Sequence, residues 1–175
     1  MPAVDILKFH VDNHIATLTL NQPETRNSIS EHEMIDAIIA ACDELNKNPD
    51  IRVAILTGAG SAFCSGGNVK DMRDKTGMFS GTNDELANNY RNGIQKIPLA
   101  LSNVEVPIIA AVNGPAVGAG CDLTCMCDIR IASEKATFAE SFIKVGIIPG
   151  DGGAWFLPRI IGISRASQMA LTGQM

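Results

Sequence analysis

The stretch "VPIIAAVNGPAVGAGCDLTCMCDIRIAS", residues 106–133, contains the pattern that decides the fold. It opens with a short apolar run, passes through Gly114, Gly118 and Gly120, and ends in a second apolar run. Apolar runs of this length between turn residues are typical of buried β-strands. A lone carboxylate, Asp122, follows the glycines at once. The stretch therefore predicts two buried strands joined by a glycine-rich turn, with an acid just behind that turn.

Strands and helices alternate along the rest of the chain. Residues 4–10 and 14–20 alternate apolar and polar positions around "VDN", which predicts a β-hairpin. Ser30 with Glu33 three residues later is a capping-box pattern, and residues 30–45 have apolar side chains at helical spacing. Residues 51–58 form another short apolar run and predict a strand. This alternation indicates an α/β protein.

Three further segments carry weaker signals. Residues 71–83 are polar with two glycines and are expected to be irregular. Residues 84–104 favour a long helix that Gly93 and Pro98 interrupt or kink. Ser164 is expected to cap a last helix.

Composition limits the class of protein. The chain has 175 residues, of which 46% are hydrophobic, and a net charge of −5. Its length indicates one domain or a large piece of one, and its charge argues against nucleic-acid binding. The first residues are too charged for a signal peptide, and no apolar run approaches the roughly 18 residues that span a bilayer. We therefore expect a soluble, cytoplasmic protein that does not bind membranes.

The cysteine count is odd, and the cysteines lie among apolar residues. They are Cys42, Cys64, Cys121, Cys125 and Cys127. The three histidines lie far upstream of the last three cysteines, so no metal-ligand pattern forms. We expect buried, reduced thiols that act as small apolar side chains, and no metal site.

Twice, an apolar strand runs into a glycine-rich loop, at residues 53–68 and 108–122. Glycines let the backbone approach a ligand closely, and a helix that begins near Gly118 would present free N–H groups. One N–H from each loop could hold an oxyanion, and Asp122 lies one helical turn after Ala119. Asp122 would then move a proton beside that oxyanion. The alternative is that the glycines only serve packing and that Asp122 only interacts with the helix dipole.

Residues 61–72 ("SAFCSGGNVKDM"), the 106–133 stretch and residues 142–162 ("FIKVGIIPGDGGAWFLPRIIG") together resemble the crotonase family, the enoyl-CoA hydratase/isomerase superfamily. Residues 20–30 are similar to its first strand-to-helix passage. The resemblance implies a ββα spiral core that binds acyl-CoA thioesters. It also implies that two backbone N–H groups polarise the thioester carbonyl and stabilise an enolate. No cofactor is implied beyond the CoA of the substrate, and the full-length protein would be a homo-oligomer, a trimer or a hexamer.

The resemblance also assigns site residues. Gly67 and Ala119 would supply the two oxyanion N–H groups, and Asp122 matches the first glutamate of the hydratases. The substrate-binding positions would be Ala62, Ser65, Gly66, Gly67, Asn68, Val69, Lys70 and Gly118. The cations Lys70, Arg73 and Lys75 either meet the CoA phosphates or form a solvated face.

Two positions depart from the hydratase pattern. The second glutamate of hydratases is replaced by Phe142, and Glu140 lies two residues earlier, where an extended backbone would point both side chains the same way. Some isomerases carry an aspartate in the last glycine loop, and Asp151 lies one residue beyond that position. Glu140 is thus a displaced second acid, or else a surface or hydrogen-bonding residue, and Asp151 is a second acid or a helix cap.

The expected function is enoyl-CoA hydration by a lyase of fatty acid metabolism, with Asp122, Asp151 and Glu140 as the candidate catalytic residues. The alternatives are double-bond isomerisation without hydration and a non-catalytic acyl-CoA-binding or assembly subunit. Thioester hydrolysis and decarboxylation could use the same oxyanion hole. Residues 1–175 are expected to be one crotonase-like core domain that lacks the family's C-terminal helical segment. Trp155 and Phe156 are expected in the core.

Overall fold

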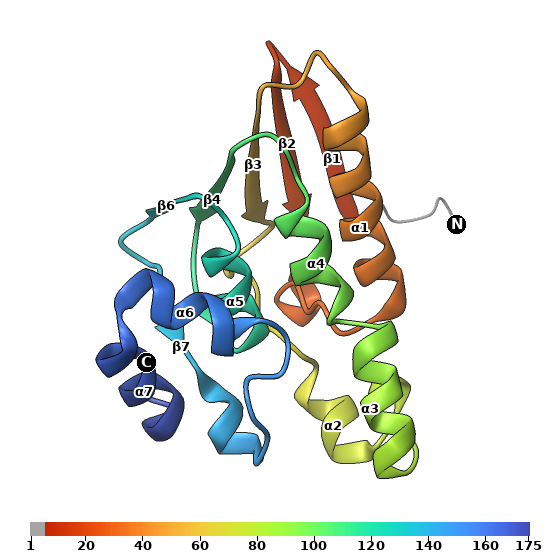
Figure 1. Ribbon diagram of the computed structural model, residues 1–175, viewed down its shortest axis with the longest axis vertical. Helices are drawn as coiled ribbons and strands as arrows, with labels where there is room; N and C mark the ends of the chain where they lie inside the picture. The colour runs from red at the N-terminus through yellow and green to blue at the C-terminus, as the bar shows by residue number, and fades with distance from the viewer. Residues whose placement is uncertain (1–5) are drawn as a thin grey trace.

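A computed structural model describes residues 6–175. Five strands form the main sheet (Figure 1). In spatial order they are β1 (Leu7–Asp12), β2 (Ile15–Leu20), β3 (Val53–Gly58), β4 (Ile108–Val112) and β6 (Ile129–Ala132). The first pair is antiparallel and the other pairs are parallel. The carboxyl ends of β2, β3 and β4 therefore meet at one edge, where the glycine-rich loops begin.

The predicted hairpin is confirmed, with a shifted turn. β1 continues through Asp12, and Asn13 and His14 form the turn with φ of 47° and 68°. Residues with short polar side chains tolerate these positive values best, so Asn13 suits its place. Residues 4 and 5 of the predicted first strand lie outside the described residues.

Two short strands, β5 (Ala116–Val117) and β7 (Phe138–Ala139), pair in parallel and form a second, smaller sheet. The helices alternate with the strands in sequence. They are α1 (His32–Lys47), α2 (Val69–Asp74), α3 (Asn83–Asn92), α4 (Lys96–Ser102), α5 (Ala119–Cys125), α6 (Gly153–Ile161) and α7 (Ile163–Thr172). The α/β class is confirmed. None of the helices within residues 6–175 has the length and apolar character needed to cross a membrane.

Short 3₁₀ turns complete the element list, at η1 (Pro23–Thr25), η2 (Gly77–Phe79) and η3 (Ser141–Val145). In Figure 1, α1 and α4 cover one side of the main sheet. The α2–α3 segment and the α6–α7 pair lie on two sides below it. In Figure 1, α5 lies between these two groups, and β7 lies beside the α6–α7 pair.

The capping box predicted at Ser30 is wrong. The N-cap of α1 is Glu31, and its side chain makes no capping bond. The Ser30 hydroxyl instead accepts a hydrogen bond from the Asn68 N–H at 3.0 Å. A tertiary contact thus outcompetes the local cap, although the apolar face of α1, including Met34 and Leu45, is buried as expected.

The segment predicted to be irregular is partly helical. α2 covers its beginning and η2 follows, so that expectation is wrong for residues 71–74 and 77–79. The interruption at Gly93 is confirmed, because Gly93 ends α3. Pro98 does not kink a helix; it occupies the first turn of α4, where an N–H has no intrahelical partner. α7 begins at Ile163 after Gly162, not at Ser164.

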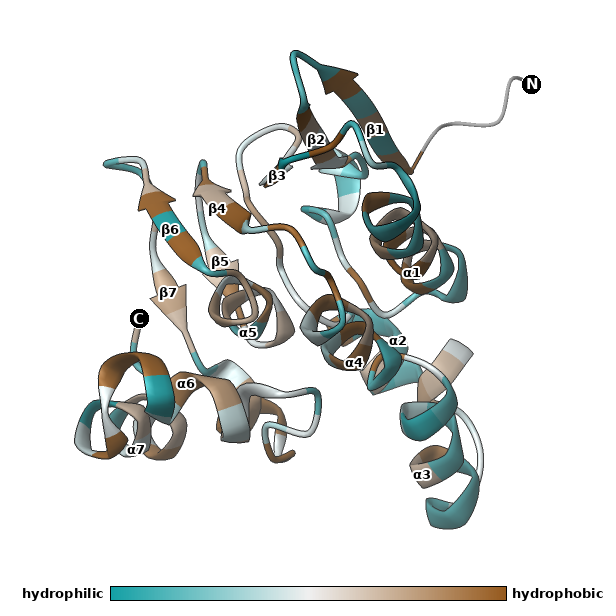
Figure 2. Cartoon of the chain, turned by 45° about the horizontal axis from the view of Figure 1, so that its top comes forward, coloured by the Kyte–Doolittle hydropathy of each residue, from teal (hydrophilic) through white to brown (hydrophobic). Residues whose placement is uncertain are grey.

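The core lies between the main sheet and α1, α4 and α5. The five cysteines are free and buried, as predicted. In Figure 2, α3 is mainly hydrophilic, whereas α6 is mainly hydrophobic along its length. The expectation that Trp155 lies in the core is wrong, because its side chain is 60% exposed and stacks on the Arg159 guanidinium at 3.3 Å. Phe156 packs against the small cluster of Cys125, Leu157 and Ala166.

Candidate active site

The two glycine-rich loops, after β3 and after β4, are bonded to each other. The Phe63 N–H donates to the Pro115 carbonyl at 3.1 Å, and the Val117 N–H donates to the Cys64 carbonyl at 3.0 Å. Cys64 and Ala116 also form a parallel bridge. Because each loop is held by backbone bonds, the N–H groups beyond these bonds have fixed positions.

Gly66 permits a close approach of the two loops. Its φ is 78°, and a Cβ there would lie 2.5 Å from the Val117 carbonyl oxygen and 3.0 Å from the Ala119 nitrogen. Only glycine fits both the conformation and the space. The first loop therefore lies directly beside the Ala119 N–H at the start of α5.

Two backbone donors at this junction are free. Within residues 6–175, neither the Gly67 N–H nor the Ala119 N–H donates a hydrogen bond. Ala119 is the first residue of α5, so its N–H has no partner inside the helix. Both donors predicted for an oxyanion are thus present and unused.

Polar residues that the sequence analysis did not single out support the first loop. The buried Asn27 amide donates to the carbonyls of Ala59, Ala62 and Phe63 at 2.9, 3.0 and 3.2 Å. The Ser28 hydroxyl donates to the Gly66 carbonyl at 3.1 Å. Asn27 lies in a turn before α1 and has a φ of 58°. The sequence "TRN" is typical of a turn, but it does not predict that the Asn27 side chain bonds to residues 59–63.

The remaining predicted substrate-binding positions lie along the same loop and the start of α2. Ala62 is buried, and the Ser65 hydroxyl donates to the Thr25 carbonyl at 3.0 Å. Asn68 caps α2 by accepting from the Lys70 N–H. Val69 and Lys70 are exposed. Arg73 is also exposed and is paired with Asp74 at 2.7 Å.

Asp122 lies one turn into α5 and is fully buried, with 0% of its surface exposed. Gly153, the first residue of α6, packs on its carboxyl group so closely that a methyl group there would overlap the oxygens. Within the described part of the chain, neither carboxyl oxygen receives an N–H or O–H hydrogen bond. The carboxyl group therefore depends on its carboxyl neighbours.

Glu140 is one of these neighbours, so its interpretation as a surface residue is wrong. Its side chain is 1% exposed and borders Asp122 and the Cys121 thiol. The backbone here is not extended, because Glu140 precedes η3 directly. Phe142 accordingly points elsewhere, and its ring lies over Gly118, 3.7 Å from where a Cβ of Gly118 would be.

Asp151 is the other neighbour, and its interpretation as a helix cap is wrong. The N-cap of α6 is Gly152, without a side-chain capping bond. Asp151 is 4% exposed. Burial raises the pKa values of Cys64 on the first loop and of Tyr90 on α3, and the nearby Asp151 charge adds to both rises. Asp151 thus lies among the first loop, α3 and Asp122.

Burial raises the pKa of all three carboxyl groups above their ordinary values. The pKa of Asp122 is raised well above its usual range, first by burial and then by contacts with Asp151 and Glu140. The same contacts lower the pKa values of Asp151 and Glu140, although burial leaves both raised overall. Asp122 therefore holds a proton most strongly and donates it to its neighbours.

A cavity of about 500 Å³ lies between α3 and residues 146–150, the segment that precedes Asp151. Tyr90, Arg91, Gln95 and Ile148 are among the residues that line it. Gln95 also donates to the Gly150 carbonyl at 2.6 Å and so fixes the loop before Asp151. The polarity of residues 84–95 gave no indication that Tyr90 and Gln95 face this loop.

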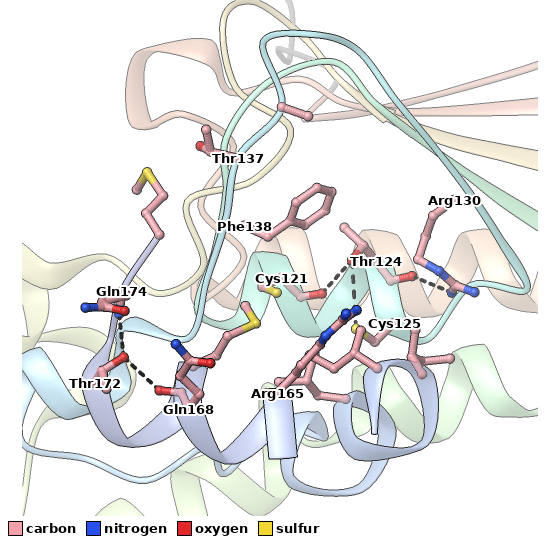
Figure 3. A pocket seen from close by; sticks show the side chains of 16 residues that line it. Cys121, Thr124, Cys125, Arg130, Thr137, Phe138, Arg165, Gln168, Thr172 and Gln174 are labelled. Carbon is pink, nitrogen blue, oxygen red and sulfur yellow. Dashed lines mark hydrogen bonds between the residues drawn. The ribbon is translucent and has the colours of Figure 1, made fainter. Parts of the chain in front are cut away.

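A larger cavity, of about 730 Å³, lies between α5 and α7. Figure 3 shows side chains around it from α5, including Cys121 and Cys125, and from α7, including Arg165 and Gln168. None of the three candidate acids lines it. Among residues 6–175, no group of His, Cys, Asp and Glu is arranged to hold a metal ion.

Comparison with known proteins identifies the family. The model of the enoyl-CoA hydratase/isomerase family matches residues 10–175. A probable enoyl-CoA hydratase of Mycobacterium tuberculosis is 37% identical over 163 residues, which cover 93% of this chain and 60% of that protein. The 1,2-epoxyphenylacetyl-CoA isomerase of Escherichia coli is 36% identical over 170 residues, which cover 97% of this chain and 63% of that protein.

The fold is also that of solved relatives. The crystal structure of an enoyl-CoA hydratase from Bacillus anthracis matches with a TM-score of 0.86 at 32% identity, over 97% of this chain and 64% of that one. The chain thus spans somewhat less than two thirds of the length of these relatives. The predicted crotonase-type fold is confirmed, and the chain belongs to the enoyl-CoA hydratase/isomerase family.

Proposed function

We propose that the protein catalyses enolate chemistry on an acyl-CoA thioester, in which the Gly67 and Ala119 N–H groups hold the thioester oxygen. The observation that carries this proposal is the pair of unused donors where the two glycine loops meet. Rigid backbone donors stabilise the negative charge that develops on the oxygen when a proton leaves the neighbouring carbon. The CoA part would follow residues 62–70, and the cavity between α3 and residues 146–150 offers room for the acyl group.

Within this proposal, Asp122 and Asp151 divide the acid and base roles. Asp122 holds its proton most strongly, so it acts as the acid. Burial raises the pKa of Asp151, but its contact with Asp122 offsets part of this rise, so Asp151 loses its proton more readily than Asp122 and acts as the base. Asp151 takes a proton from one substrate carbon, the enolate forms, and Asp122 gives its proton to another carbon. The proton then passes from Asp151 to Asp122 across their contact, which restores the starting state.

This cycle moves a double bond and consumes no water, so it is an isomerisation. Two features favour it over the hydration expected first. Phe142 leaves no carboxylate at the position of the second hydratase glutamate, and Asp122 and Asp151 touch each other, which leaves no place for a water between them. Hydration remains the second candidate, because the relatives include a protein named as a probable enoyl-CoA hydratase.

Product identification with two substrates tests the proposal. Isomerisation predicts conversion of a 3-enoyl-CoA to the 2-enoyl-CoA, with no 3-hydroxyacyl-CoA from crotonyl-CoA. Formation of the 3-hydroxy product would instead support hydration. Binding of acetyl-CoA and longer acyl-CoA esters, measured by calorimetry, accompanies these assays. Binding without turnover of either substrate would indicate a non-catalytic acyl-CoA-binding subunit. Absence of binding at millimolar concentration would contradict the proposal.

A further inference from the structure

Glu140 is a buried carboxyl group that the proposed acid–base pair does not use. It is 1% exposed, and within the described residues the polar side chains that contact its carboxyl group are the Asp122 carboxyl and the Cys121 thiol. It borders a small cavity of about 180 Å³ whose other walls come from the 149–170 region, including Leu157 and Ala166. An unpaired carboxyl in such apolar surroundings is costly unless another group compensates it.

The compensating group is Asp122. Asp122 contacts both Glu140 and Asp151, whereas Glu140 and Asp151 affect each other only through their charges. The groups that act on these three side chains are carboxyls, backbone and the Cys121 thiol, and none of them is a cation. Carboxyl groups in contact without a cation cannot all be ionised, so a proton must lie between them.

We propose that Glu140 is a positioning residue that holds the proton on Asp122 and orients the Asp122 carboxyl toward the substrate. This role rests on the proposed function. Glu140 reaches Asp122 from the segment between β7 and η3, while Gly153 blocks another side of the same carboxyl group. Asp122 is therefore confined by backbone and by a carboxylate that accepts its proton. Glu140 itself does not touch the substrate.

Glu140→Gln separates this role from direct catalysis. The amide of glutamine can donate a hydrogen bond to the Asp122 oxygens, which favours the ionised form of Asp122. In a plot of kcat against pH, kcat should fall at high pH as Asp122 loses its proton. In Glu140→Gln this fall should occur at lower pH than in the wild type. The rate ratio of wild type to variant should rise from about one at low pH to about tenfold or more above the pH of that fall. Glu140→Asp, which keeps a carboxyl group, should retain part of the original profile.

Asp128→Asn is the matched control. It also neutralises one carboxylate, but Asp128 is exposed and its side chain accepts from the Ile108 N–H outside the cluster. Its kcat profile should coincide with that of the wild type.

A second readout does not need turnover. A shared proton held in the folded state makes the unfolding equilibrium constant rise by about tenfold per pH unit above the ordinary carboxyl range. Denaturant unfolding at a series of pH values should show a weaker rise for Glu140→Gln and for Asp122→Asn. In the double variant the two losses should not add, because both single variants remove the same proton.

The outcomes distinguish the two proposals. Loss of turnover at every pH in Glu140→Gln, with acyl-CoA binding retained, would show that Glu140 is itself the catalytic acid and overturn the inference. The inference would also be wrong if Glu140→Gln left the pH profile of kcat unchanged and the effects of the two single variants on the pH dependence of unfolding added in the double variant. A third outcome separates the two proposals. If no substrate turns over, but the single variants reduce the pH dependence of unfolding by amounts that do not add in the double variant, the proposed reaction is wrong and the shared proton between Glu140 and Asp122 is supported.

Discussion

Ala119→Pro removes one of the two proposed oxyanion donors. Ala119 is the first residue of α5, where proline is well tolerated because the N–H there has no intrahelical partner. In the described residues this N–H donates to nothing, so the folded protein loses no hydrogen bond. The variant therefore tests the donor rather than the helix.

The expected loss follows from the number of donors. With Ala119→Pro, the thioester oxygen keeps only the Gly67 N–H. Loss of one such donor typically lowers kcat by about 10²–10³-fold, or about 2.7–4 kcal/mol. KM should change less, because the donor acts mainly on the charge that develops in the transition state.

Steady-state kinetics with a 3-enoyl-CoA measure this loss, and thermal unfolding checks that the variant is folded. His32→Pro is the matched control, because His32 is the exposed first residue of α1 and lies outside the site. That control should keep the wild-type kcat. A stably folded Ala119→Pro protein with wild-type kcat would refute the assignment of this N–H to the oxyanion.

Four further outcomes are expected. Asp122→Asn and Asp151→Asn should each lower kcat by about 10²–10⁴-fold while calorimetry shows nearly unchanged CoA-ester binding; full activity in either would remove that residue from the mechanism. Because burial raises the pKa values of Asp122, Glu140 and Asp151, the folded state holds more protons than the unfolded one. Their contribution to the free energy of unfolding should thus be greatest below the ordinary carboxyl pKa range and fall by about 1.4 kcal/mol per pH unit per retained proton as pH rises. Urea titrations in which the wild type and Asp122→Asn show the same pH dependence would contradict this. Gly153→Ala should displace the Asp122 carboxyl, so the activation free energy calculated from kcat should rise by more than the free energy of unfolding falls. Kinetics and unfolding of the same variant measure the two quantities, and an unchanged kcat would contradict the packing argument. The full-length protein should be a homo-oligomer, a trimer or hexamer, and light scattering that gives a monomer would exclude this.

Patterns that depend on neighbours in sequence were predicted well. The hairpin and the buried strands β3 and β4 follow from apolar periodicity. The strand β6 also forms where it was expected, but the prediction that it is buried is wrong, because Ile129 and Ile131 are 51% and 61% exposed at the edge of the sheet. The burial of the cysteines also follows from their apolar context. These features are local, so single-sequence patterns suffice for them.

Features that depend on distant contacts were missed. Ser30 has the pattern of a helix cap, yet its hydroxyl accepts a hydrogen bond from the Asn68 N–H, 38 residues away. Asp151 has the pattern of a cap as well, and Glu140 that of a surface acid, yet both are held against Asp122 by the packing of α6 and η3 around α5. Because like charges normally avoid one another, no local rule predicts a cluster of three buried carboxyl groups.

The buried cysteines give the protein an internal chemical reporter. Thiolates, not thiols, react with alkylating reagents, and burial raises the pKa values of Cys42, Cys64 and Cys127 to about 12. Cys125 differs, because contact with the Cys121 thiol lowers its pKa and it borders the large cavity beside α7. Iodoacetamide should therefore label Cys125 first, when α7 moves away from α5, and the other three only after the core opens. The order of labelling would distinguish local opening at α7 from global unfolding without any added probe.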